Sequence, residues 1–269
     1  MQLKELNLRE LQEACFKVLL DVHQFCVKNN IRYSLTWGTL LGAVRHQGFI
    51  PWDDDVDIMM PRPDYDTFCK QYRSEHTMLI APGNHSYLPY ARVADLTSTY
   101  EDDSSYPWTD IRHGVWIDVF PIDGATDNEE HETKRYEHAK KLRHKNSLFR
   151  ISRCKINQDN SIIQNLKILS RKIRFGWQNP NPAHLKLLKE VNYDDADFAV
   201  SLGVADEYGL CYFPKSYFEI YTTLKFESES LMVISNYKDL LNSVYGDYMK
   251  LPPPSQRIPG HRTSKFYSI

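Results

Sequence analysis

The spacing of hydrophobic positions predicts a long helix near the start of the chain, followed by a strand. Apolar side chains recur every three or four residues between positions 8 and 28, which is the spacing of one helix face. They are Leu8, Leu11, Cys15, Val18, Leu19, Val22, Phe25 and Cys26. Asn29 and Asn30 interrupt the pattern, and residues 31–37 then alternate in polarity as a half-buried strand does. A glycine turn at Gly38 and Thr39 leads into a short helical stretch.

The next apolar run carries a dense group of acids. Four aspartates fall within five positions: Asp53, Asp54, Asp55 and Asp57. Polarity alternates from Asp55 to Ile58, which predicts a strand with the carboxylates of Asp55 and Asp57 on one face. Val56 and Ile58 would then enter the core. Pro61 is expected to end the strand, because proline cannot donate to a strand ladder.

Helices and strands continue to alternate beyond the acids. We expect a helix over 63–73 and strands near 77–80, 88–95 and 115–120. This alternation predicts an α/β (α+β) core over residues 1–125, with a mixed sheet flanked by helices. Residues 126–269 are expected to form a basic, mainly helical region that packs on the core.

Charge is distributed unevenly along the chain. The net charge is −2, yet between Lys134 and Arg174 we count thirteen Lys or Arg against two acids, which suggests an anionic partner. Residues 161–177 combine an apolar stripe at helical spacing with lysines and arginines. Such a helix either lies on an anionic membrane surface or packs its stripe on the core, and core packing is the commoner use. Nucleic acid is disfavoured, because a recognition motif is missing and the whole chain is slightly acidic.

Cysteine usage and hydropathy bear on location. The five cysteines are odd in number and include no CxxC pair, which favours a reducing compartment over a zinc site or a disulfide framework. No apolar run approaches the roughly 20 residues of a membrane span, and the first residues lead directly into an amphipathic helix rather than a signal peptide. We therefore expect a cytoplasmic protein, with peripheral contact at the inner face of the membrane if residues 161–177 bind lipid.

The cluster of four aspartates at positions 53–57 indicates a binding site for a cation. Carboxylates this dense beside buried structure need a cation, because their repulsion and burial would otherwise raise their pKa values. A divalent metal that assists chemistry on a phosphate is the first hypothesis. Gly38 and Thr39 at a helix start suit a phosphate, and Arg45 could add a bidentate contact. The alternative is a solvated turn or a structural calcium loop. The glycine spacing and distant bidentate glutamate of a calcium loop are missing from the sequence.

A second acidic position lies far along the chain. Residues 115–120 are apolar almost throughout, with Asp118 in the middle. A charge in a buried strand is costly unless it is paired or bound to metal. Asp118 is therefore either a metal ligand or the partner of Arg92 or Arg112. Asp123, just past Pro121, is expected in a loop or at a helix cap.

Several of these segments closely resemble the LicD family of phosphocholine transferases, a branch of the nucleotidyltransferase-fold superfamily. The matching runs are residues 37–45, 48–58 and 114–123, with Asp64, Tyr65 and Phe68 between them, and residues 245–249 with Pro252, Pro253, Arg257 and His261. The resemblance spans about residues 10–262. It implies a nucleotidyltransferase fold for a catalytic core over residues 1–125, and a contribution of residues 126–269 to the donor and acceptor site.

The resemblance also implies a reaction. The donor would be CDP-choline, and the acceptor a hydroxyl of a cell-surface glycan such as a teichoic acid or lipopolysaccharide, which is either free or lipid-linked. Mg²⁺ or Mn²⁺ would be held by Asp55, Asp57 and Asp118. Gly38 and Thr39 would hold the donor phosphates. The general base would be one of Asp53, Asp54 and Asp118, a choice that the sequence leaves open.

Choline adds an expectation about aromatic residues. A quaternary ammonium binds aromatic faces, and the candidate contacts near the motifs are Trp37, Trp52, Tyr106, Trp108 and Trp116. Arg257 and His261 are candidates to close over the site. Competing functions are transfer of phosphoribitol or phosphoglycerol from a CDP-alcohol, nucleotidyl transfer from an NTP to a small molecule, and glycan binding by a vestigial core.

Overall fold

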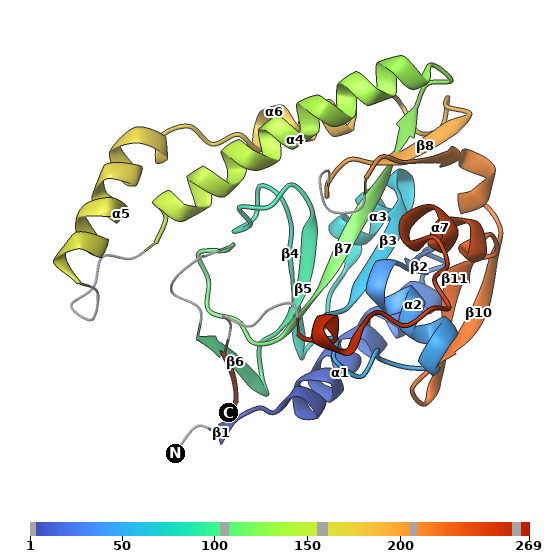
Figure 1. Ribbon diagram of the computed structural model, residues 1–269, viewed down its shortest axis with the longest axis horizontal. Coiled ribbons are helices and arrows are strands. Elements are labelled where there is room, and N and C mark those ends of the chain that lie inside the picture. The colour runs from blue at the N-terminus through green and yellow to red at the C-terminus, as the bar shows by residue number, and fades with distance from the viewer. Residues whose placement is uncertain (1–3, 103–107, 155–160, 205–208, 260–264) are drawn as a thin grey trace.

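A mixed seven-stranded sheet forms the centre of the molecule (Figure 1). The computed structural model describes residues 4–102, 108–154, 161–204, 209–259 and 265–269. In sheet order the strands are β2 (Ser34–Leu35), β3 (Asp57–Pro61), β7 (Trp116–Ala125), β5 (Ala91–Asp95) and β4 (Thr77–Ile80), while β8 (Phe198–Ser201) pairs with the end of β7 and β9 (Cys211–Pro214) with β8. Strands β3 and β7 run parallel, and the other pairs are antiparallel. The predicted α/β class is confirmed.

Three helices from the first half pack around the sheet. They are α1 (Leu8–Lys28), α2 (Trp37–His46) and α3 (Arg62–Gln71). The predicted helix at 8–28 is confirmed, and a capping box at Asn7 and Glu10 starts it. Phe25 of α1 meets Phe68 of α3 edge to face, with ring centroids 5.9 Å apart, so the two helices contact each other.

The second half of the chain adds both helices and strands. Its helices are α4 (Glu129–Ser152), α5 (Ile162–Phe175), α6 (Asn181–Leu188) and α7 (Tyr237–Tyr245), with 3-10 turns η1 (Lys215–Phe218) and η2 (Pro254–Gln256). Strands β10 (Tyr221–Phe226) and β11 (Glu229–Ile234) form a hairpin that contacts α2 and β2, and β1 (Lys4–Glu5), β12 (Lys265–Ser268) and β6 (Thr99–Asp102) form a small sheet. Residues beyond 125 therefore extend the central sheet through β8 and β9.

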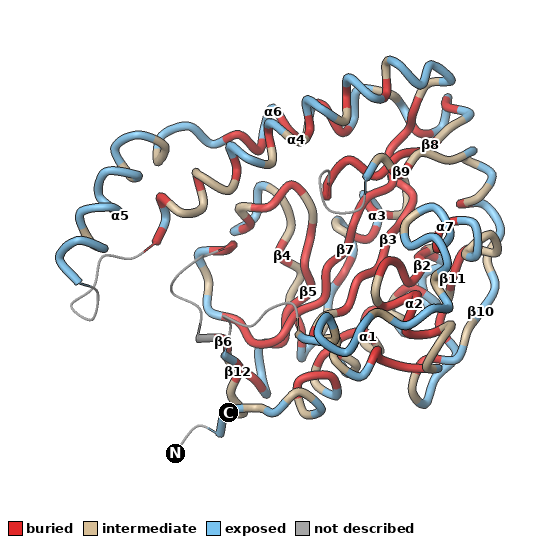
Figure 2. The backbone as a smooth tube through the Cα atoms, in the orientation of Figure 1, coloured by how far each residue is buried: buried red, intermediate tan, exposed pale blue. Residues whose placement is uncertain are grey.

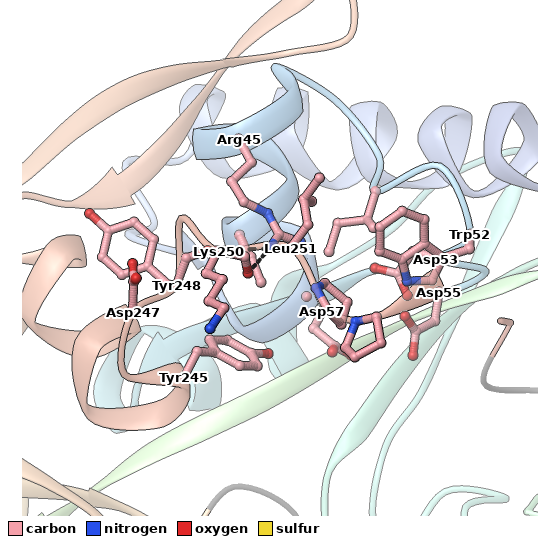
Figure 3. Close-up of a pocket in the computed structure, with 15 residues that line it drawn as sticks. Arg45, Trp52, Asp53, Asp55, Asp57, Tyr245, Asp247, Tyr248, Lys250 and Leu251 are labelled. Carbon is pink, nitrogen blue, oxygen red and sulfur yellow. Dashed lines mark hydrogen bonds between the residues drawn. The ribbon is translucent and has the colours of Figure 1, made fainter. Parts of the chain in front are cut away.

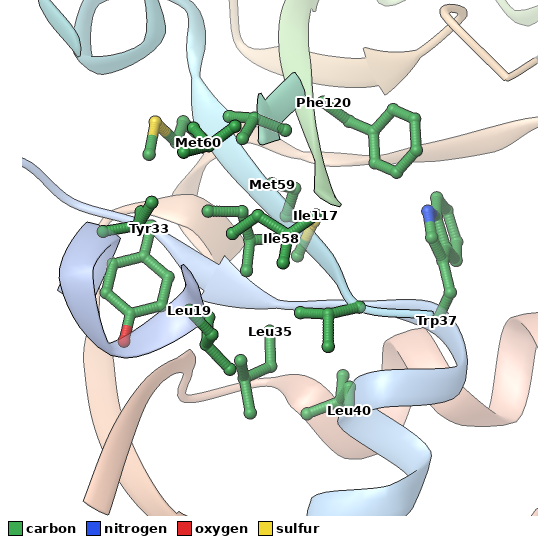
Figure 4. Close-up of a cluster of buried hydrophobic side chains, with 14 of the residues drawn as sticks. Leu19, Tyr33, Leu35, Trp37, Leu40, Ile58, Met59, Met60, Ile117 and Phe120 are labelled. Carbon is green, nitrogen blue, oxygen red and sulfur yellow. The ribbon is translucent and has the colours of Figure 1, made fainter. Parts of the chain in front are cut away.

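One large core joins both halves of the chain (Figure 2). Around β2 and β3 it contains Leu19, Leu35 and Ile58 (Figure 4), and Phe226 and Leu231 of the hairpin belong to the same cluster. Helix α5 is different, because none of its residues is buried. Packing of its apolar stripe on the core, the commoner alternative, is therefore wrong. Among the residues described, every helix is too short or too polar to span a bilayer.

Two predictions near the acids, one of a strand and one of a helix, need correction. Strand β3 begins at Asp57, so Asp55 lies in the preceding loop and the predicted strand from Asp55 to Ile58 is wrong at its start. The reason is that Gln12 of α1 holds this loop, donating from Nε2 to the carbonyls of Ile50 (3.3 Å) and Asp53 (2.8 Å). Helix α2 also begins earlier than expected, so Gly38 and Thr39 lie in its first turn.

The position of Asp123 was also wrongly predicted. Strand β7 continues through Pro121 to Ala125, so Asp123 lies within a buried strand. Its carboxylate pairs with Arg62 Nε at 2.6 Å, and both side chains are nearly inaccessible. The ion pair allows a charge at this position, which a reading of nearby residues alone cannot foresee.

Candidate active site

Backbone hydrogen bonds tie the start of α2 to the first residue of β3. The Asp57 N–H donates to Thr39 Oγ1 at 2.9 Å, and the Asp57 carbonyl accepts from the Thr36 N–H at 3.1 Å. Thr39 is 2% exposed. Its hydroxyl therefore fixes the position of Asp57, and a direct contact of Thr39 with phosphate stays a prediction.

The loop before β3 gathers three carboxylates. One oxygen from each of Asp53, Asp54 and Asp55 lies within 4.8 Å of the other two. Gly38 makes this arrangement possible, because a Cβ added there would lie only 2.8 Å from Asp53 Oδ2. Hard divalent cations are bound by several carboxylate oxygens at once, so this oxygen set fits Mg²⁺ or Mn²⁺.

Asp57, Asp118 and Arg92 form a row across three neighbouring strands. Asp57 is in register with Asp118, and Asp118 with Arg92, so the three side chains share one face of the sheet. Arg92 donates to both oxygens of Asp118, from Nε to Oδ1 and from Nη2 to Oδ2, the latter at 3.2 Å. Of the two arginines considered for this ion pair, Arg92 is the partner. Metal ligation by Asp118 stays a prediction, and its oxygens would then serve two cations.

Two tryptophans beside this row, Trp108 and Trp116, contact the Arg92 guanidinium with their rings. The Arg92 guanidinium lies 4.5 Å from the ring centre of Trp108 and 4.6 Å from that of Trp116. Both rings are buried and enclose a cation of the chain itself. Trp108 and Trp116 therefore position Arg92, and through it Asp118.

A cavity of about 770 Å³ lies beside the acid loop (Figure 3). Asp53, Asp55 and Asp57 line one side of it, and Tyr245 and Lys250 approach from the other. The remaining lining residues are Gly38, Leu41, Arg45, Ile50, Trp52, Asp247, Tyr248, Leu251, Pro252 and Pro253. The cavity thus has an acidic wall from the first half of the chain and a wall from α7 and the segment after it.

Arg45 connects the two walls. From the last turn of α2, its Nη1 donates to the carbonyls of Tyr248 (3.2 Å) and Lys250 (3.5 Å). Burial lowers the pKa of the guanidinium, and the nearby Tyr245 and Asp53 act in the opposite direction. Arg45 therefore holds the C-terminal segment over the cavity and carries positive charge into it.

Trp52 and Arg257 meet at the cavity. Trp52 lines the cavity, and the Arg257 guanidinium lies 5.5 Å from the centre of its ring. Arg257 Nε also donates to the Pro252 carbonyl at 2.9 Å. Trp37, another candidate choline contact, is 2% exposed and belongs to the core, so a contact of Trp37 with choline stays a prediction. Tyr106 and His261 lie outside the described residues.

Sequence reasoning missed several cavity residues. Tyr245 was matched only as part of a motif, yet burial raises its pKa and Asp57, Asp53 and Asp55 raise it further, which indicates closeness to the acids. Lys250 and Asp247 carried no separate signal. Gln12 did offer one, because it is a polar side chain on the apolar face of α1.

Comparison with known proteins adds independent findings. The family model described as LicD/FKTN/FKRP, nucleotidyltransferase domain, matches residues 30–160. The chain is 30% identical over 277 residues to the lipopolysaccharide cholinephosphotransferase LicD of Haemophilus influenzae, covering 96% of this chain and 97% of that protein. It is 28% identical over 119 residues to the ribitol 5-phosphate transferase FKRP of Homo sapiens, which covers 39% of this chain and 24% of that protein.

A shorter match is closer in sequence. Over 51 residues, 19% of each chain, the protein is 53% identical to an uncharacterized protein of Rickettsia prowazekii. The similarity to the Haemophilus protein, by contrast, extends over nearly the full length of both chains. Together with the match of the nucleotidyltransferase domain, it shows that this chain belongs to the LicD family.

Proposed function

We propose that this protein transfers phosphocholine from CDP-choline to a hydroxyl of a cell-surface glycan. The observation that carries the proposal is the cavity in which carboxylates of the acid loop and Asp57 lie opposite Lys250, with Arg45 between the walls. A donor with a diphosphate needs both a cation site and direct positive charge. Family membership, including a relative named as a cholinephosphotransferase and one named as a ribitol 5-phosphate transferase, supports transfer of a phospho-alcohol.

We further propose that Mg²⁺ or Mn²⁺ is held by the oxygens of Asp53, Asp54 and Asp55, with Asp57 at the same cavity. When bound, the ion supplies charge neutralisation for the diphosphate and for the departing CMP. The spacing of the carboxylate oxygens supports this assignment. The family resemblance assigns Asp118 as a third ligand. In this proposal its main role is to lie beside Asp57 on the same face of the sheet.

The chain's own residues orient the reactants. Gly38 exposes the backbone at the start of α2, where N–H groups and the helix dipole favour an anion. Lys250 contributes positive charge on the opposite wall, and Arg45 contributes it between the two walls. The acceptor oxygen attacks phosphorus of the phosphocholine group, the bond from phosphorus to the CMP oxygen breaks, and the carboxylate oxygen of Asp53 or Asp54 that is not offered to the ion accepts the hydroxyl proton.

In this proposal Trp52 makes the site selective for choline over an uncharged alcohol. Its ring lines the cavity and already receives one cation, Arg257, at 5.5 Å. Cation–π contacts of this kind contribute about 0.5–2 kcal/mol, and quaternary ammonium groups use them. Ribitol is uncharged and gains nothing from this contact. Phosphoribitol transfer is the second candidate, because the FKRP relative carries that activity in its name.

Parallel calorimetry tests the proposal. The protein with Mg²⁺ is titrated with CDP-choline, CDP-ribitol, CDP-glycerol and CTP, and the same series is repeated with Trp52→Leu. We expect CDP-choline to bind most tightly, and Trp52→Leu to weaken its binding by about two- to thirtyfold while leaving CDP-ribitol unchanged. Equal binding of all four nucleotides, or preference for CDP-ribitol in both proteins, would overturn the choline assignment.

A further inference from the structure

Helix α5 projects from the body of the protein beside α4 (Figures 1 and 2). Its half-buried residues are Asn165, Ile168, Lys172 and Phe175. They recur at intervals of three and four, so they mark one face, the face that packs on its neighbours. Every other residue of the helix is exposed.

The apolar stripe of α5 lies on a different face. Ile162 is 80% exposed, Leu166 59%, Leu169 45% and Ile173 71%. At 3.6 residues per turn, this stripe is centred about a third of a turn from the packing face. Ile163 and Trp177 extend the exposed apolar surface, at 65% and 74% exposed. Monomeric soluble proteins rarely leave such a contiguous surface uncovered.

Positive charge borders the stripe. Lys167 and Arg174 lie on one flank, Arg171 lies just beyond them, and Lys172 lies on the other flank. The sequence of α5 contains no aspartate or glutamate. At the end of the helix, Arg153 and Lys172 line a cavity of about 460 Å³ with Trp177. Cations, an apolar stripe and a terminal tryptophan are therefore combined on one projecting element.

We propose that α5 docks the protein on an anionic lipid bilayer, with the stripe inserted at the level of the headgroups. The lysine and arginine chains would extend from the flanks to lipid phosphates, and Trp177 would lie at the interface. A second copy of the chain is a poorer occupant, because it would bring Lys167, Arg171 and Arg174 against the same cations. This inference does not depend on the proposed transfer reaction.

Vesicle flotation of the full chain tests the docking. We expect binding to vesicles of phosphatidylcholine with 30% phosphatidylglycerol, at about 0.1 M salt, and little binding to phosphatidylcholine alone. Leu166→Asn with Ile173→Asn should weaken binding at least tenfold, because two apolar side chains no longer leave water. Lys167→Gln with Arg174→Gln should weaken it by about fivefold for each charge removed.

The matched control is Ile220→Asn, which alters a side chain that is 66% exposed but lies outside α5. It should bind vesicles like the unaltered protein. All variants change exposed residues, and thermal unfolding checks that they fold. Equal binding to neutral and anionic vesicles, or unchanged binding of both α5 variants, would overturn the proposal. So would a concentration-dependent dimer in sedimentation that Leu166→Asn with Ile173→Asn abolishes, because the stripe would then face a second copy.

Discussion

Replacing Thr39 by valine tests whether its hydroxyl positions Asp57 or contacts the donor. Valine has nearly the shape of threonine, so the change removes the acceptor of the Asp57 N–H, at 2.9 Å, without opening a cavity. Thr39 and Asp57 are 2% and 5% exposed, so water cannot readily replace the lost oxygen. An orphaned buried donor costs about 1–3 kcal/mol. We expect the free energy of unfolding of Thr39→Val to fall by that amount.

Urea denaturation gives the stability change as a shift in midpoint at constant slope. Thr39→Ser is the control, since it keeps the oxygen and loses one buried methyl group, worth about 0.8 kcal/mol. Mn²⁺ titration should show weaker binding by Thr39→Val than by Thr39→Ser, because Asp57 is no longer held. If Thr39→Val loses CDP-choline binding with less than about 0.5 kcal/mol of destabilisation, the hydroxyl contacts the donor and our reasoning is refuted.

Three further predictions follow from other buried polar groups. Gln12→Leu should leave the helical content unchanged but weaken Mn²⁺ binding in calorimetry, because the loop carrying Asp53 loses two hydrogen bonds; unchanged affinity would contradict the positioning role. Asp95 is buried, which raises its pKa, but hydrogen bonds from neighbouring hydroxyls and N–H groups outweigh this and lower it. Its stabilisation should therefore be present at neutral pH and be lost as the pH falls through the lowered value. In acid titrations of stability, Asp95→Asn should differ from the unaltered protein at pH 7 and converge with it once the pH falls below the lowered pKa; a constant difference would argue against the linkage. Asp123→Ala should cost about 3–5 kcal/mol in urea, because it leaves the Arg62 charge buried, and Arg62→Met with Asp123→Leu should recover much of that; failure to recover would locate the cost elsewhere.

Much of the fold, and the family, could be predicted from local patterns in the sequence. The 3.6-residue spacing of α1 and the alternation that leads to β3 are properties of adjacent residues, so they are readable without tertiary information. The acids at 53–57 and the glycine at 38 likewise fall within one short segment. Their density already required a cation or an unusual environment.

Other features depended on partners distant in sequence. Asp118 and Asp123 are both acids in an apolar strand. The sequence predicted a buried strand position for Asp118 and a loop or helix cap for Asp123. In the structure both are paired with a buried arginine, Asp118 with Arg92 and Asp123 with Arg62. Gln12 fixes the acid loop from 41 positions away. Lys250 reaches the cavity because Arg45 binds the carbonyls around it. Such pairings follow from which strands and helices become neighbours, and not from local periodicity.

The sequence by itself determined the family and predicted the class of chemistry, because carboxylate clusters and glycine turns act through residues close together in the chain. The tertiary structure decided which acids share a cation-sized space, that Trp52 rather than Trp37 faces the cavity, and that the stripe of α5 is exposed. A stripe of apolar side chains has the same spacing whether it packs on a core or remains in water. Only the placement of its neighbours in space distinguishes the two.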